Sequence, residues 1–167
     1  MSELRDKRGQ TEAESIASFR ARNFPRPHLT ADIAVFEKGN EGLKLLLIRR
    51  GGHPYLGCWA LPGGFADEGE TIEQTAAREL EEETDLTGLD LQLVGIYSAP
   101  GRDPRGWTVS AAYTVCVAPG RCRPIAGDDA AETRWFPVDA GGKVALPEGE
   151  RLAFDHARII ADAVKHI

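Results

Sequence analysis

Residues 64–86 read GFADEGETIEQTAARELEEETDL, and this stretch decides the fold of the chain. Thr71, followed three residues later by Gln74, forms the pattern of a capping box, in which each side chain satisfies a free backbone amide. No Pro or Gly interrupts residues 72–84, and most residues there are strong helix formers. The pattern predicts a helix over residues 72–84 that follows a glycine-containing turn.

Glutamates lie on the apolar side of this predicted helix. At about 100° per residue, Glu79 and Glu83 share a face with Ile72 and Ala76, and Glu82 flanks that face. Like charges four residues apart repel each other, and a half-buried unpaired carboxylate costs more still. A bound cation would remove this cost, and an all-oxygen ligand set suits Mg²⁺ or Mn²⁺. The alternative, a solvated acidic face, accounts for the outward-facing glutamates but not for Glu79 and Glu83.

Composition and charge bound the class of protein. The chain has 167 residues, 42% of them apolar, which is enough for one globular domain with a substantial core. Its net charge of −6 argues against binding of a nucleic-acid polymer, because contacts to phosphates need a basic surface. A single nucleotide stays compatible with this charge if a bound metal ion supplies the positive charge.

The sequence predicts a cytoplasmic protein that does not enter a membrane. The first residues are polar and contain no apolar signal region, and the longest apolar run, 43–48, is broken by Lys44. Cys58, Cys116 and Cys122 form no CxxC pair and are interpreted as reduced thiols. Cys116 lies in an apolar strand pattern, so we expect it in the core.

Residues 1–28 are expected to form an N-terminal extension. A short helix is predicted within residues 11–22, and Pro25 and Pro27 make the following segment extended. We expect this segment to run across the body of the protein or against a partner subunit.

Residues 29–167 are expected to form one domain. Alternating and apolar patterns predict strands at 31–37, 43–50, 59–61, 89–98, 107–117 and 133–136, and a closing helix at 151–167. Strands with one helix in the middle and one at the end indicate an α+β fold, a layered sandwich around a central mixed β-sheet. Trp107, Trp135 and Phe136 are expected to pack in the core rather than stack on a base.

The opening stretch resembles the sequence box of Nudix hydrolases, G-x5-E-x7-R-E-U-x-E-E-x-G-U, where U is bulky and apolar. The matching residues are Gly64, Glu70, Arg78, Glu79, Leu80, Glu82, Glu83 and Leu86. The one departure is Asp85, where the family has a glycine that ends the helix. Asp tolerates the left-handed conformation better than most residues, so the departure concerns the helix terminus and not the metal site.

The resemblance implies a Nudix-like α/β/α sandwich and a set of site residues. Glu79, Glu82 and Glu83 are implied to bind catalytic Mg²⁺, with Mn²⁺ as an alternative, and Arg78 to hold one of these glutamates. A backbone carbonyl of the Gly63–Gly64 turn is implied to join the coordination. The implied reaction is attack of water on a phosphorus atom of a nucleoside diphosphate linked to another group.

A second stretch, SAPGRDPRGWTVSAAY at 98–113, resembles a turn of the ADP-ribose pyrophosphatase subgroup. Arg102 and Arg105 could bind a phosphate in bidentate fashion, with Asp103 fixing the turn or Arg105. A solvated hairpin tip is the alternative for both arginines. The resemblance implies hydrolysis of ADP-ribose to AMP and ribose 5-phosphate.

Further expectations concern Glu132, Asp155 and the type of activity. Glu132 is the first candidate for a catalytic carboxylate outside the box, with a solvated loop acid as the alternative. Asp155 is expected to have a capping or structural role rather than a catalytic one. A nucleoside triphosphate pyrophosphohydrolase and an ADP-ribose-sensing module are the alternative functions. Some sensors of this kind add a winged-helix domain after the Nudix domain. Residues 137–167, which follow Phe136, are too few for such a domain, and this favours the enzyme.

The resemblance also implies an oligomeric state. Members of the subgroup often form dimers, so a homodimer is expected.

Overall fold

The computed structural model describes residues 4–121 and 132–167. Its helices are α1 (Glu12–Arg20), α2 (Ile72–Thr84) and α3 (His156–Ala163), the last continuing into the 3-10 helix η1 (Val164–His166). Its strands are β1 (His28–Gly39), β2 (Gly42–Arg49), β3 (Trp59–Ala60), β4 (Gly63–Phe65), β5 (Gln92–Tyr97), β6 (Thr108–Val117) and β7 (Thr133–Pro137).

The strands form one mixed sheet, as predicted. Its order is β3-β2-β1-β6-β5, with β4 paired to β1 and β7 paired to β2. The long central pair β1–β6 is parallel, and the other pairs are antiparallel. A parallel central pair is stable here because helices cover both faces of the sheet.

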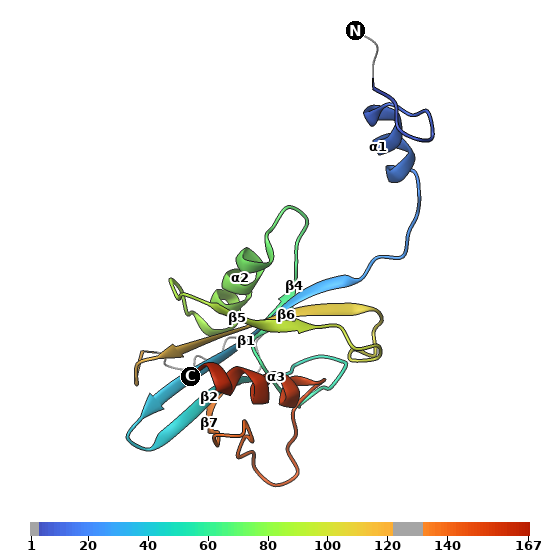
Figure 1. Ribbon diagram of the computed structural model, residues 1–167. Coiled ribbons are helices and arrows are strands. Elements are labelled where there is room, and N and C mark those ends of the chain that lie inside the picture. The colour runs from blue at the N-terminus through green and yellow to red at the C-terminus, as the bar shows by residue number, and fades with distance from the viewer. Residues whose placement is uncertain (1–3, 122–131) are drawn as a thin grey trace.

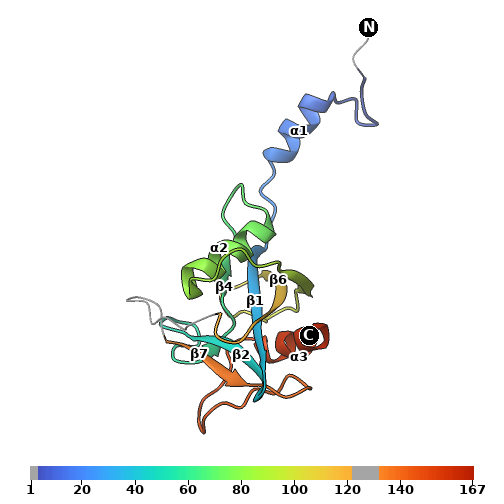
Figure 2. The ribbon, with the colours of Figure 1, turned by 90° about the vertical axis from the view of Figure 1, so that its left-hand side faces the viewer.

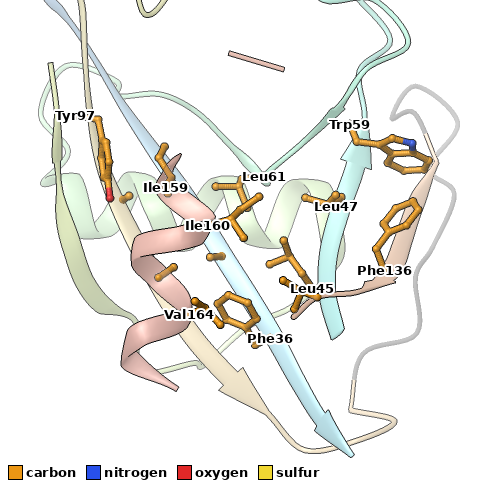
Figure 3. Close-up of a cluster of buried hydrophobic side chains, with 14 residues drawn as sticks. Phe36, Leu45, Leu47, Trp59, Leu61, Tyr97, Phe136, Ile159, Ile160 and Val164 are labelled. Atoms are coloured by element: carbon orange, nitrogen blue, oxygen red, sulfur yellow. The ribbon is translucent and has the colours of Figure 1, made fainter. Parts of the chain in front are cut away.

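The two faces of the sheet carry different helices, which gives the predicted layered α+β sandwich (Figure 1). Alternate residues of β1 point to opposite faces. Ala31, Ile33 and Val35 pack with Ala76 and Leu80 of α2. On the other face, Ile159 and Ile160 of α3 belong to one buried cluster with side chains of β1 and β2, namely Ala34, Phe36, Leu45 and Leu47. Figure 3 shows this cluster, with Phe36, Leu45 and Leu47 facing the helix.

Two elements differ from the sequence-based prediction. The closing helix begins at His156 and not at residue 151, because Phe154 has a left-handed backbone (φ 50°) that a helix cannot contain. The Gly63–Gly64 turn is in fact the start of β4, which pairs with β1 through Asp32↔Gly63 and Thr30↔Phe65. A pair of glycines carries no strand signal, so only the neighbouring strand determines this element.

The aromatic predictions had a mixed outcome. Phe136 is buried with an edge-on contact to Trp59, and Trp135 is half-buried against the α2 side of the core, as expected. The prediction for Trp107 was wrong, because it precedes β6 and is 56% exposed.

The prediction that Cys116 lies in the core was also wrong. This residue lies next to the last residue of β6 and is exposed, whereas Cys58 is buried.

Helix α1 stands apart from the sheet (Figures 1 and 2). Thr11 and Glu14 form its capping box, but none of its own residues is buried, and Ile16 and Phe19 are exposed. The segment after α1 therefore leads away from the body of the chain instead of crossing it. Among the described residues, no helix is both long and apolar enough to cross a membrane.

Candidate active site

Helix α2 forms as its sequence predicts and presents two carboxylates beside its buried face. The Thr71 hydroxyl accepts from the Gln74 amide at 3.3 Å, and the Gln74 side chain accepts from the Thr71 amide at 2.8 Å. The helix ends at Asp85, which adopts the left-handed conformation with φ 59°. Its buried residues are Thr75, Ala76, Leu80 and Thr84. Glu79 and Glu83 are half-buried along one edge of this face.

Glu83 is held against the glycine turn. Its carboxylate accepts a hydrogen bond from the Gly63 amide at 2.8 Å. Burial raises the pKa of Glu83 to about 8, and the charges of Glu79 and Asp32 add to the rise. The half-buried negative charge of Glu83 is therefore poorly compensated by the protein itself, as expected for a carboxylate that faces a cation.

Glu79 lies directly against Gly64. A Cβ atom at position 64 would stand 2.4 Å from the Glu79 carboxylate, so only glycine leaves room for this group. Arg78 Nη1 donates to the carboxylate at 2.7 Å. Burial nevertheless raises the pKa of Glu79, because desolvation outweighs the contact with Arg78.

Arg78 contacts several carboxylates of the box. Its Nε and Nη2 donate to Glu70 at 2.7 and 3.0 Å, and its Nη1 lies 3.4 Å from Glu82. Its Nη2 also donates to the Phe65 carbonyl at 3.0 Å, which ties α2 to β4. The hydrogen bond from Arg78 lowers the pKa of Glu70 to about 2. Glu70 therefore acts as an anchor for Arg78.

The donor set fits a hard divalent cation. Glu79, Glu82 and Glu83 supply oxygen atoms only, and two of them are half-buried with a raised pKa. Within residues 4–121 and 132–167, no three acidic, His or Cys side chains already stand together as a metal site. Glu79 and Glu82 turn toward Arg78 and Glu83 toward the Gly63 amide, so a cation would draw these side chains together.

A cavity of about 170 Å³ opens beside the glycine turn. Its lining includes five residues that the sequence predicted for the site, namely Gly63, Gly64, Arg102, Asp103 and Arg105. It also includes Thr30, Asp32, Arg50, Leu61, Phe65, Phe154 and His156, which sequence reasoning missed. Asp32 carried a signal, because it is the one charged residue in the apolar run 31–36. Nothing local distinguishes Arg50 or His156.

Arg102 and Arg105 occupy different environments. The Arg102 side chain is 5% exposed and donates to both carboxylate oxygens of Asp155, at 2.7 and 3.0 Å. Burial opposes its charge, but Asp155 and Asp32 raise the pKa of Arg102. The Arg105 side chain is 41% exposed and is held by Asp103, as predicted for Asp103. Arg105 is thus the more accessible of the two arginines.

A buried polar network closes the floor of the cavity. The Ser110 hydroxyl donates to Asp32, and Nη2 of Arg102 lies 3.6 Å from the same carboxylate. Nε2 of His156 faces Asp32 at 3.5 Å, and its Nδ1 accepts from the Leu61 amide at 2.9 Å. Burial lowers the pKa of His156, so the ring is neutral and Nδ1 is free to accept.

Glu132 lies outside the cavity lining. It directly precedes β7, where its carbonyl accepts from the Arg49 amide at 2.8 Å and its carboxylate lies 3.7 Å from Nη1 of Arg49. Its side chain is 50% exposed. The neighbouring acids of the predicted loop, Asp128 and Asp129, fall outside the described residues.

Comparison with known proteins identifies the family. The family model described as the NUDIX domain matches residues 26–162. An ADP-ribose pyrophosphatase of Methanocaldococcus jannaschii is 42% identical over 144 residues, which cover 86% of this chain and 77% of that protein. The ADPR-responsive transcriptional repressor NtrR of Acinetobacter baylyi is 35% identical over 155 residues, and this alignment spans 92% of this chain but 59% of the repressor.

Solved structures give the same result. The NUDIX domain of Shewanella oneidensis NrtR, crystallised with ADP-ribose, superposes with a TM-score of 0.79 and 34% identity, covering 94% of this chain and 99% of that one. A MutT/nudix family protein from Enterococcus faecalis also gives a TM-score of 0.79, with 33% identity over 96% of this chain and 70% of that one. These matches agree with the sequence box on α2 and with the mixed sheet between two helices. The chain therefore belongs to the Nudix family.

Proposed function

We propose that this protein is a divalent-metal-dependent pyrophosphohydrolase that cleaves ADP-ribose to AMP and ribose 5-phosphate. The observation that carries the proposal is the position of the box carboxylates, which line one edge of α2 next to a cavity that contains arginines. The similarity to the ADP-ribose pyrophosphatase of M. jannaschii supports the choice of substrate.

In this proposal Glu79, Glu82 and Glu83, with a carbonyl of the Gly63–Gly64 turn, hold Mg²⁺ or Mn²⁺. When bound, such an ion neutralises pyrophosphate charge and lowers the pKa of a bound water. The protein itself contributes orientation and charge. Arg78 holds Glu79 and Glu82 in place.

Further residues act on the substrate and on the water. Arg105, fixed by Asp103, reaches the cavity and binds phosphate. Arg102 contributes to the same surface from its buried position. Glu132 is the candidate general base. This role requires its side chain to approach the substrate from the start of β7.

Two other functions have specific support. An ADP-ribose sensor is favoured by the similarity to NtrR and to the NUDIX domain bound to ADP-ribose. A triphosphate hydrolase is favoured by a putative 8-oxo-dGTP diphosphatase of Bacillus subtilis, which is 39% identical over 61 residues, 36% of this chain. The retained box carboxylates favour catalysis over sensing.

The experiment that tests the proposal is a substrate panel. ADP-ribose, nucleoside triphosphates and other nucleoside diphosphate derivatives are incubated with Mg²⁺, with Mn²⁺ and with a chelator, and the products are separated by chromatography. We expect AMP and ribose 5-phosphate from ADP-ribose, dependent on metal. Faster cleavage of triphosphates would support the hydrolase alternative, and binding of ADP-ribose without cleavage would support the sensor.

Substitution of the box carboxylates tests the site. Glu82→Gln and Glu83→Gln should each abolish metal-dependent hydrolysis while the circular dichroism spectrum stays unchanged. Glu81→Gln is the matched control, because this neighbouring side chain is exposed. Normal turnover in both Glu82→Gln and Glu83→Gln would refute the assignment of the metal ligands.

We also propose that residues 1–28 form an extension that contacts a second copy of the chain in a cytoplasmic homodimer. The support is the position of α1 away from the sheet, with Ile16, Phe19 and Phe24 exposed. Light scattering should report twice the monomer mass for the full chain and a lower mass after removal of residues 1–27. A monomeric full-length chain would refute this part of the proposal.

A further inference from the structure

Arg50 is a half-buried cation that forms no ion pair with a carboxylate among the described residues. It follows β2, and its backbone is fixed on both sides by hydrogen bonds with Cys58 (2.9 Å) and Gly57 (2.8 Å). Its Nε donates to the Pro54 carbonyl at 2.8 Å. Within the described part of the chain, no carboxylate lies within ion-pair distance of Arg50, and its Nη1 and Nη2 donate to no protein atom. A half-buried guanidinium without an anionic partner is costly, as for any buried charge.

The other arginines of the cavity are already paired. Arg102 is bound on two nitrogens by Asp155 and is nearly buried. Arg105 uses Nε and Nη2 for Asp103, and its Nη1 donates to no atom among the described residues. The unused N–H groups in this cavity therefore belong to Arg50, to Nη1 of Arg105 and to Nη1 of Arg102, and of these three side chains that of Arg102 is nearly buried.

The guanidinium groups of Arg50 and Arg105 both pack on the ring of Phe154. Its ring centre is 4.9 Å from the guanidinium carbon of Arg50 and 5.6 Å from that of Arg105. Phe154 has φ 50° and packs against Tyr55, which has φ 61°, in a tilted ring contact with centres 4.7 Å apart. Two non-glycine residues in this disfavoured conformation, packed on each other, are held there by their surroundings. The ring is thus a fixed support for both arginines.

The two cations repel each other in the ligand-free protein. Burial lowers the pKa of Arg50 and the nearby charge of Arg105 lowers it further, while the more distant charges of Glu83 and Asp103 oppose this shift only in part. An anion that accepts from both guanidinium groups would remove this repulsion and satisfy the unused donors. The hydroxyl of Thr30, which also lines the cavity, is buried and has no partner among the described residues, so it offers one more hydrogen bond to a ligand.

We propose that Arg50 and Arg105, supported by Phe154, form a clamp for a phosphate group of the substrate. Arg50 is a substrate-binding residue that the local sequence pattern does not indicate. The cavity volume of about 170 Å³ fits a phosphate with part of a sugar. Gly63 and Gly64 line the same cavity as the clamp and also contact Glu83 and Glu79, which places the clamp beside the proposed metal site. The identity of the phosphate as part of ADP-ribose rests on the proposed function.

The test compares Arg50→Gln and Arg50→Lys with the wild-type protein. Binding of ADP-ribose is measured by calorimetry on the full chain with EDTA, and KM and kcat are measured with Mg²⁺. We expect Arg50→Gln to weaken binding and raise KM about tenfold or more, because a hydrogen bond to a charged group is lost, while kcat changes little. Arg50→Lys should lie between the two, since Lys keeps the charge but not the planar donor set.

Arg134→Gln is the matched control. Arg134 also stacks on a phenylalanine, with its guanidinium 5.2 Å from the ring centre of Phe136, but it lies on β7 and does not line the cavity. Unchanged binding and KM in Arg50→Gln, or an equal loss in Arg134→Gln, would overturn the clamp. If ADP-ribose binds without being cleaved, the proposed hydrolysis fails, and the binding comparison still decides whether the clamp exists.

Discussion

The Glu79 carboxylate packs against Gly64 so closely that a Cβ atom at position 64 would stand 2.4 Å from it. At Gly63 the obstacle is instead main chain, because a Cβ atom there would stand 2.1 Å from the Ala31 carbonyl oxygen. The two neighbouring glycines therefore have different tasks. Gly63 allows β4 to approach β1, and Gly64 leaves space for a carboxylate of the proposed metal site.

Gly64→Ala should reduce activity far more than stability. The clash involves the end of a flexible side chain, so Glu79 can move away at small cost, but it then leaves its site. We expect a loss of hydrolysis of about 100-fold or more, of the size found when positioned charge is lost, with a melting temperature within about 4 °C of wild type. Steady-state kinetics and calorimetry measure the two quantities.

Gly63→Ala is the contrasting variant. Its clash is with backbone, and φ at this position is +151°, so we expect severe destabilisation or failure to fold. Equal loss of stability in both variants would contradict the separate roles of these glycines.

The metal-free protein should lose stability as the pH rises. Burial raises the pKa of Glu83 to about 8 in the folded state, against 4.5 for an exposed glutamate. The folded state therefore binds this proton more tightly than the unfolded state. The resulting stabilisation is complete below about pH 4.5 and is lost as the pH approaches 8. We expect a change on the order of 4 kcal/mol between these limits.

Denaturant unfolding in EDTA across this pH range measures the effect. Glu83→Gln should remove most of the pH dependence and leave the smaller part that comes from Glu79, whereas Glu81→Gln should retain all of it, because Glu81 is exposed. Saturating Mg²⁺ should remove the dependence as well, since a bound cation stabilises the ionised carboxylate. Stability that rises from pH 5 to pH 8 without metal would contradict this account of Glu83.

Arg102→Gln should act mainly on stability. It would leave Asp155 and the buried Asp32 without the cation that they now face, which costs about 3–5 kcal/mol for a buried pair. Arg102→Lys should recover only part of this, because Lys cannot donate to both oxygens of Asp155 in the same geometry. Thermal unfolding measures the loss. A raised KM with unchanged stability would instead support direct binding of phosphate by Arg102.

Asp85→Gly should stabilise the protein slightly. Asp85 ends α2 with φ 59°, a conformation that costs a non-glycine residue more than glycine. The extra freedom of glycine in the unfolded state offsets part of the gain, so we expect about 1 kcal/mol or less. That corresponds to a melting temperature higher by up to about 4 °C. Asp85→Ala is the control, and it should lower the melting temperature.

The sequence by itself determined α2 and the identity of its box residues. The Thr71–Gln74 capping box and the left-handed terminus at Asp85 are local interactions, formed within one or two turns, so residue spacing is enough to predict them. The placement of Glu79 and Glu83 on the edge of the buried face follows from the helical period alone. The same spacing supplied the family resemblance that comparison with known proteins confirmed.

Only the tertiary structure decided which arginine is paired and which is left for a ligand. Arg102 and Arg105 lie in one turn with the same local pattern, yet Arg102 meets Asp155, 53 residues later, and is buried. No local sequence feature marks Arg50 as functional: its guanidinium packs on Phe154, which is distant in sequence, and among the described residues no carboxylate lies within ion-pair distance of it. Such partners are set by how the strands and α3 pack, because a side chain's charge balance depends on neighbours in space and not in sequence.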